Sequence, residues 1–197
     1  PKVAIVDPEL TYSMPVELTR ITGSDAFTHA VETYISKGTG QNHDTDAVSL
    51  EALRYISTYL PRAIQDGSDL VAREKMSLAS LMAGVSIAKK GTCLPHRMQQ
   101  AMGSVVEMPH AVGTAALYPA WLRRVYPHAQ EKFDKISEIL DPKSPGSYES
   151  IITFMKSIGM YRNLREFAEP SQVDSFVDRM SGNLAFDPIP GIDKRMI

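Results

Sequence analysis

The stretch "LVAREKMSLASLMAGVSIAK", residues 70–89, has the clearest helical pattern in this chain. Asp69 stands directly before it, where its side chain can cap the first backbone N–H groups, and Gly91 follows as a typical helix end. We therefore predict a long helix at the centre of the hydrophobic core, whose apolar residues are Met76, Ala79, Leu81, Met82 and Val85.

Further helices are predicted on both sides of this stretch. A helix over 45–59 has apolar residues at helical spacing and ends at Pro61; these residues are Leu50, Leu53, Ile56 and Leu60. The same capping and periodicity signals predict helices over 15–21, 22–37, 95–102, 111–125, 129–139, 147–158, 162–167 and 172–181. The expected fold class is mostly α, a multi-helix, bundle-like domain with one short N-terminal strand.

That strand is "VAIVD", residues 3–7, a short β-branched run stopped by Pro8. A single strand cannot form a sheet, so either its neighbours are missing or it lies isolated on a helical body. We divide the chain into a strand and linker over 1–12 and an all-helical domain over 13–197.

Composition narrows the functional classes. The 197 residues are 43% hydrophobic and 22% charged, as in ordinary globular domains, and the net charge of −2 provides no basic field for nucleic acid. No apolar run approaches the roughly 20 residues of a membrane helix. Cys93 is the only cysteine, so neither an intramolecular disulfide nor a thiolate zinc site can form, and we expect a cytoplasmic protein.

Asp25 and His29 stand four positions apart in the predicted helix over 22–37. This spacing places both side chains on one helical face, where they could converge on a divalent metal. A simple side-chain hydrogen bond, or an aspartate favoured by the helix dipole, explains an isolated pair equally well.

His96 and His110 are fourteen residues apart, the first in a short predicted helix and the second just after Pro109. They could meet if the intervening loop folds back, although two surface histidines can show this spacing by coincidence. Together with Asp25 and His29 they would fill four positions around Fe²⁺ or Zn²⁺. His43 and His128 fall outside this set.

Two motifs bear a specific resemblance. The segment "TGSDAFTHAVETYISKG" (residues 22–38) and the pattern H-x3-Q-x2-G…PH over 96–110 resemble the C-terminal, metal-binding domain of the iron-containing (group III) alcohol dehydrogenases. Members of that family carry T-G-x-D-A-x-x-H-A and H-x3-H…P-H-G. The resemblance extends from the N-terminal strand to about residue 125, and more loosely through the later helices.

The resemblance implies a metal site and a reaction. The family's ligands fall on Asp25, His29, His96 and His110, and the ion would act as a Lewis acid while hydride passes between a small alcohol or aldehyde substrate and a nicotinamide. Gln100 stands beside the cofactor position, where the family often has a histidine, so proton relay there is in doubt because glutamine cannot titrate. Ala111 replaces the family's glycine.

A glycine-rich phosphate loop is absent from these 197 residues. The resemblance therefore implies that residues 1–12 remain from a separate nucleotide-binding domain that holds most of the NAD or NADP, and that this chain alone is inactive. Homo-oligomers are common among such enzymes.

Two other functional classes stay open. His43 and Asp44, with His29 upstream, are similar to the ligand pattern of HD-type metal-dependent phosphohydrolases, although this reading leaves His96 and His110 unused. The chain could also be a non-catalytic helical metal-binding module.

Overall fold

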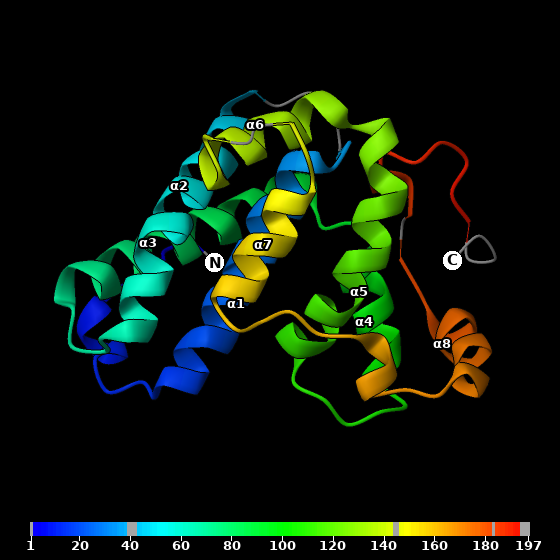
Figure 1. Ribbon diagram of the computed structural model, residues 1–197, viewed down its shortest axis with the longest axis horizontal. Helices are drawn as coiled ribbons and strands as arrows, with labels where there is room; N and C mark the ends of the chain where they lie inside the picture. The colour runs from blue at the N-terminus through cyan, green and yellow to red at the C-terminus, as the bar shows by residue number, and fades with distance from the viewer. Residues whose placement is uncertain (1, 39–42, 144–145, 183, 194–197) are drawn as a thin grey trace.

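The computed structural model describes residues 2–38, 43–143, 146–182 and 184–193. Within them the chain forms eight α helices joined by loops and short 3₁₀ turns (Figure 1). They are α1 (Val16–Ile35), α2 (His43–Gln65), α3 (Leu70–Lys90), α4 (Leu94–Met102), α5 (His110–Val125), α6 (Gln130–Leu140), α7 (Glu149–Ser157) and α8 (Val173–Arg179). The predicted mostly-α fold class is confirmed.

Helices α1, α2 and α3 pack against one another and form one side of the molecule (Figure 1). Three of the four apolar α2 residues of the predicted pattern, Leu53, Ile56 and Leu60, are fully inaccessible there, and Leu50 is half-buried. Gly23 of α1 faces Leu60 so closely that a Cβ atom at this position would lie 2.2 Å from a methyl group of Leu60. A residue without a side chain therefore lets the two helices approach.

The predicted break between two helices near residue 22 is wrong, because α1 is continuous. Thr22 and Ser24 bond back to helical carbonyls, with the Thr22 hydroxyl 2.8 Å from Leu18 O and the Ser24 hydroxyl 2.8 Å from Ile21 O. Polar residues that can start a helix are thus accommodated within one. Likewise α2 does not end at Pro61 but continues to Gln65.

Helix α3 differs from its predicted role in one respect. It does contact both α1 and α2, but Leu81 and Val85 are 38% and 43% exposed. The residues of α3 that pack inward are mostly small: Ala72, Ala79, Ala83 and Ser86. Small side chains let α3 lie close to its neighbours, while Leu81 and Val85 lie on its outer surface.

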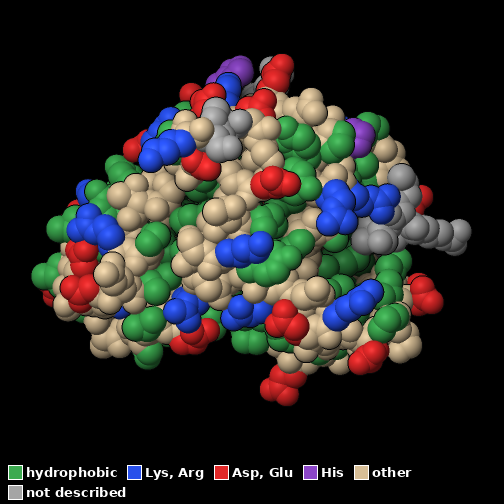
Figure 2. Space-filling view, in the orientation of Figure 1, with side chains coloured by type: hydrophobic (Ala, Val, Ile, Leu, Met, Phe, Trp, Pro, Cys, Tyr) green, Lys and Arg blue, Asp and Glu red, His purple; other side chains and the backbone are tan. Residues whose placement is uncertain are grey.

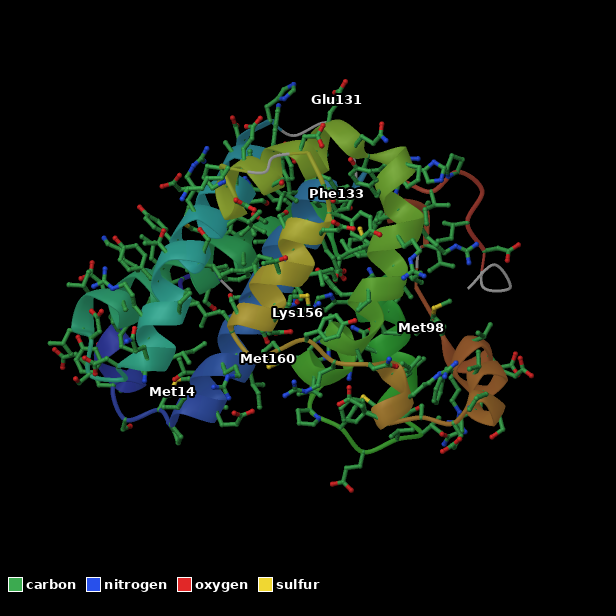
Figure 3. The ribbon with its side chains drawn as sticks, in the orientation of Figure 1. Met14, Met98, Glu131, Phe133, Lys156 and Met160 are labelled. Carbon is green, nitrogen blue, oxygen red and sulfur yellow. The ribbon has the colours of Figure 1, made fainter. Side chains whose placement is uncertain are left out.

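The other side of the molecule is built from α4, α5 and α8, while α6 packs against α1, α2 and α7 (Figure 1). Figure 3 labels Phe133, a fully buried residue of α6, and Met98 of α4. Met98 lines an apolar cavity of about 200 Å³ together with Trp121 and Phe176. The predicted helix over 162–167 is reduced to a 3₁₀ turn, Leu164–Glu166.

A buried carboxylate ties the C-terminal part of the chain to α4. Asp187 is 1% exposed and accepts hydrogen bonds from the backbone N–H of Leu94 (2.7 Å) and from Trp121 Nε1 (3.1 Å). Because Leu94 is the first residue of α4, this bond satisfies one of the free N–H groups at the helix start.

The predicted strand over residues 3–7 is not formed in the described part of the chain. Val3 and Ile5 are 77% and 91% exposed, so the apolar side chains that predicted a strand have no neighbouring strand to cover them. Asp7 instead caps the 3₁₀ turn Pro8–Thr11 by accepting from Glu9 N at 3.0 Å.

Figure 2 shows positive and negative side chains interspersed on the visible face rather than gathered by sign. This agrees with the small net charge. Among the described residues, no helix is both long and apolar enough to cross a membrane.

Candidate metal centre

The four side chains predicted to bind metal come from three helices and lie together. Helix α1 carries Asp25 and His29, α4 carries His96 in its first turn, and His110 is the first residue of α5. One potential ligand atom from each residue lies within 4.8 Å of the others. The structure thus brings Asp25 close to His110, which lies 85 positions later in the chain. That the four residues bind a metal stays a prediction.

The carboxylate of Asp25 is at the middle of this group. Its Oδ1 lies 3.8 Å from His96 Nε2 and 3.6 Å from His110 Nε2, while Oδ2 lies 3.7 Å from His29 Nδ1. These distances are longer than hydrogen bonds. Metal–ligand bonds of about 2.1 Å in tetrahedral geometry separate neighbouring ligand atoms by about 3.4 Å. The group is therefore close to the size needed to surround one divalent ion.

Two atoms at this centre are buried without a partner. Asp25 Oδ1 and His96 Nε2 have no hydrogen bond to any described residue, although both are inaccessible to solvent. Leaving a buried polar atom unpaired is costly, and such an atom in a native structure calls for an explanation. A cation between them would satisfy both, so the donor set fits a metal ion.

The charge states also suit a cation. Burial would raise the pKa of Asp25, but the nearby imidazoles of His96, His29 and His110 lower it below its usual value, so the carboxylate is ionised. Burial and the neighbouring His96 lower the pKa of His29 to about 4. A neutral imidazole and an ionised carboxylate are the forms that bind metal.

His96 is different because it lies next to two carboxylates. Burial alone would lower its pKa, but Glu32 and Asp25 raise it to about 9. In the absence of metal, a proton on His96 offsets the two negative charges. A divalent ion in the same place would displace that proton.

Two residues that the sequence analysis did not identify hydrogen-bond to the histidines through Nδ1, the ring nitrogen that faces away from Asp25. His96 Nδ1 lies 2.7 Å from Glu32 Oε1, and His110 Nδ1 is hydrogen-bonded to Gln99 Oε1. The sequence held a signal for both, because Glu32 follows His29 by three residues and Gln99 follows His96 by three, which is one helical turn.

The remaining predicted residues lie as follows. Gln100 is exposed on α4, one turn after His96, and Ala111 is buried in the first turn of α5. His43 and Asp44 are exposed at the start of α2 and belong to no group of potential ligands among the described residues, so the phosphohydrolase pattern is not assembled. His128 is exposed in a 3₁₀ turn.

A groove of about 420 Å³ opens beside the four side chains. Asp25, His29 and His110 form part of its wall, and the rest comes from mostly small or apolar residues, which are Ile21, Thr22, Ala26, Ser80, Gly84, Ile87 and Ala111. A small molecule in this groove would reach the candidate metal position directly.

Comparison with known proteins agrees with this geometry. Residues 19–181 match the family model described as Fe-containing alcohol dehydrogenase family, C-terminal. The chain is 34% identical to 1,3-propanediol dehydrogenase of Citrobacter freundii, with 100% of this chain and 53% of that protein aligned. It is also 34% identical to NAD-dependent methanol dehydrogenase of Bacillus methanolicus, over 87% of this chain and 44% of the relative.

Solved structures show the same likeness. The crystal structure of a 1,3-propanediol oxidoreductase superimposes with a TM-score of 0.87 at 33% identity, over 96% of this chain and 52% of the other. An archaeal halo-thermophilic alcohol dehydrogenase from a Red Sea brine pool gives a TM-score of 0.88 at 26% identity, over 99% and 52%. The chain spans about half the length of the curated relatives it matches.

Proposed function

Because the chain belongs to the iron-containing alcohol dehydrogenase family, we propose that it is the metal-binding part of an enzyme that interconverts an alcohol and its carbonyl compound. The nicotinamide cofactor NAD or NADP would accept or donate the hydride. Relatives whose names specify 1,3-propanediol and methanol dehydrogenases support a small alcohol or aldehyde as the substrate.

One observation carries the proposal: Asp25, His29, His96 and His110 converge, with two inaccessible ligand atoms left unpaired at their centre. One carboxylate oxygen and three imidazole nitrogens accept either ferrous iron or zinc. Family membership favours iron.

The metal would supply Lewis-acid chemistry, stabilising negative charge on the oxygen of the alcohol or carbonyl group. The residues of this chain supply its setting. Asp25 contributes the negative charge, and the mostly small or apolar wall of the groove borders the space beside the ligands. Gln100 can donate or accept a hydrogen bond at the edge of the site but cannot carry a proton away, so a proton must leave by another route.

Metal analysis tests the proposal. The chain is loaded with ferrous iron without oxygen, and the bound metal is measured for the wild type, Asp25→Ala and His96→Ala. We expect about one ion in the wild type and a large loss in both variants. His43→Ala is the control, since this exposed histidine lies outside the group and its loss should leave metal content unchanged. Equal occupancy in all four proteins would overturn the proposal.

A second measurement separates the enzyme from a non-catalytic metal-binding module. Co²⁺ in place of the native ion gives an absorption spectrum that changes when a ligand is added. A small primary alcohol should shift this spectrum if the groove admits substrate to the metal, and should leave it unchanged in a module that only stores the ion.

We further expect the 197-residue chain by itself to bind metal without oxidising alcohols, because none of its segments has the pattern of a phosphate-binding loop. NAD(P)-dependent oxidation of an alcohol by the purified chain would contradict this expectation.

A further inference from the structure

We propose that Glu32 and Gln99 are positioning residues that support the two later histidines unequally, so that His96 is a firmly held ligand and His110 is the one that opens to admit the ion. This inference rests on the proposed metal site. It goes beyond that site, because neither Glu32 nor Gln99 would touch the ion.

The first step is the orientation of the rings. His96 and His110 both turn Nε2 toward Asp25, at 3.8 and 3.6 Å, and both turn Nδ1 toward a side-chain oxygen. Because the carboxylate of Glu32 and the amide oxygen of Gln99 accept, Nδ1 of each ring donates. With an ion in place of the second proton of His96, the Nε2 lone pairs of both rings would point at the candidate metal position.

The second step is the difference between the two supports. Glu32 is fully inaccessible and offers a carboxylate, whereas Gln99 offers a neutral amide. Glu32 also accepts from the backbone N–H of Cys93 at 2.8 Å and from the Tyr118 hydroxyl at 3.3 Å. Its position is thus held by residues at the start of α4 and on α5, so the ring it orients has little freedom to turn.

The third step is exposure. The side chain of His96 is 3% exposed, and that of His110 is 42% exposed. A carboxylate behind an imidazole makes it a stronger metal ligand than a neutral acceptor does. His96 would therefore stay in place before the ion arrives, and the solvent-facing ring of His110 would turn to admit the ion and complete the site from the open side.

Removing the carboxylate that supports His96, and placing one beside His110, tests whether the two supports differ in strength. Affinity for Zn²⁺ and Co²⁺ is measured by competition with a coloured chelator for the wild type, Glu32→Gln and Gln99→Glu. Glu32→Gln should weaken binding about 10- to 100-fold, the range typical for outer partners of metal ligands. Gln99→Glu should strengthen binding and slow release of the ion to the chelator. A purely structural role predicts no gain from the second substitution.

A matched control separates positioning from general stability. Asp187→Asn also alters a buried carboxylate bonded to the start of α4, but Asp187 contacts neither histidine. We expect its metal affinity and Co²⁺ spectrum to equal those of the wild type, while Glu32→Gln changes both. If Glu32→Gln does not fold, the gain expected for Gln99→Glu still decides the matter.

The outcomes are distinct. A wild type that binds no metal overturns the proposed site and this inference together. A wild type that binds metal, with Glu32→Gln within twofold of it or Gln99→Glu weaker than it, leaves the metal site standing and overturns only the inference.

Discussion

The two sides of the molecule are held together by different kinds of contact. Helices α1, α2 and α3 meet mostly through apolar and small side chains, such as the fully buried Leu53 and Ile56, with polar contacts such as Arg73 to Thr19 among them. Helices α4 and α5 are also joined to the rest through buried polar groups, since Glu32 and Asp187 bind the first N–H groups of α4. The candidate metal centre lies where these two sides meet.

This difference shows how a precise site is assembled from distant segments. Apolar contacts are non-directional and place α1 as a whole, and its own helical spacing then sets Asp25 beside His29. Hydrogen bonds are directional, and those that Glu32 makes with the backbone N–H of Cys93 and with His96 Nδ1 orient the His96 ring. The three predictions below probe this contrast.

The largest expected effect is a pH dependence that comes from the polar side. Burial raises the pKa of Asp187 from 3.8 to about 6, although bonds from Leu94 and Trp121 oppose the shift. Because the folded state binds the proton more tightly than the unfolded state, this group stabilises the fold below about pH 4. That contribution is lost as the pH rises through 6, and it amounts to about 3 kcal/mol.

Urea unfolding of the wild type and Asp187→Asn at pH 4 and pH 7 measures this effect. The free energy of unfolding should fall from pH 4 to pH 7 by about 3 kcal/mol more in the wild type than in the variant. If the free energy of unfolding changed with pH to the same extent in both proteins, burial would not raise the pKa of Asp187.

The next effect belongs to the apolar side. Gly23→Ala would place a Cβ atom 2.2 Å from a buried methyl group of Leu60, so either the Leu60 side chain or the two helices must shift. We expect a loss of about 1–3 kcal/mol in the free energy of unfolding, the usual cost of overpacking. Gly84→Ala is the matched control in α3, because nothing lies within 4 Å of its added Cβ.

The control should gain up to about 1 kcal/mol, since alanine favours a helix over glycine. Thermal or urea unfolding of both variants decides the comparison. If both substitutions changed stability in the same direction, close packing at Gly23 would not be what brings α1 and α2 together.

The smallest effect concerns a single link between the two sides. The Tyr118 hydroxyl of α5 donates to Thr28 O of α1 at 3.0 Å and lies 3.3 Å from Glu32 Oε1. Tyr118→Phe should cost about 1 kcal/mol, because the other partners of Glu32 remain. Tyr126→Phe removes an exposed bond to Gly146 O and should cost less. Equal losses in urea unfolding would contradict a special role for the buried link.

Much of the helical framework could be predicted from the sequence. The long helix after Asp69 begins as expected, because the Asp69 side chain accepts from Ala72 N and caps it. Boundaries failed where tertiary contacts outweigh local signals. Thr22 and Ser24 remain inside α1, and Pro61 lies inside α2, where Leu60 and Ala63 are buried on either side of it.

The candidate site was only partly predictable from residue types. Asp25 and His29 follow from helical spacing, while His96 and His110 were joined to them through family resemblance. Spacing places Glu32 on the helical face of His29, but it does not show what Glu32 or Asp187 binds. The backbone N–H groups that these two carboxylates accept from lie 61 and 93 residues away along the chain.

Cys93 adds one consequence. It directly precedes α4, its side chain is buried, and its backbone N–H is bonded to Glu32. Burial also raises the pKa of its thiol, so it has little of the thiolate form that alkylating reagents attack. Modification of this single sulfhydryl must therefore wait until the first turn of α4 detaches from α1, and its rate measures how often the metal-binding region opens while the rest of the protein stays folded.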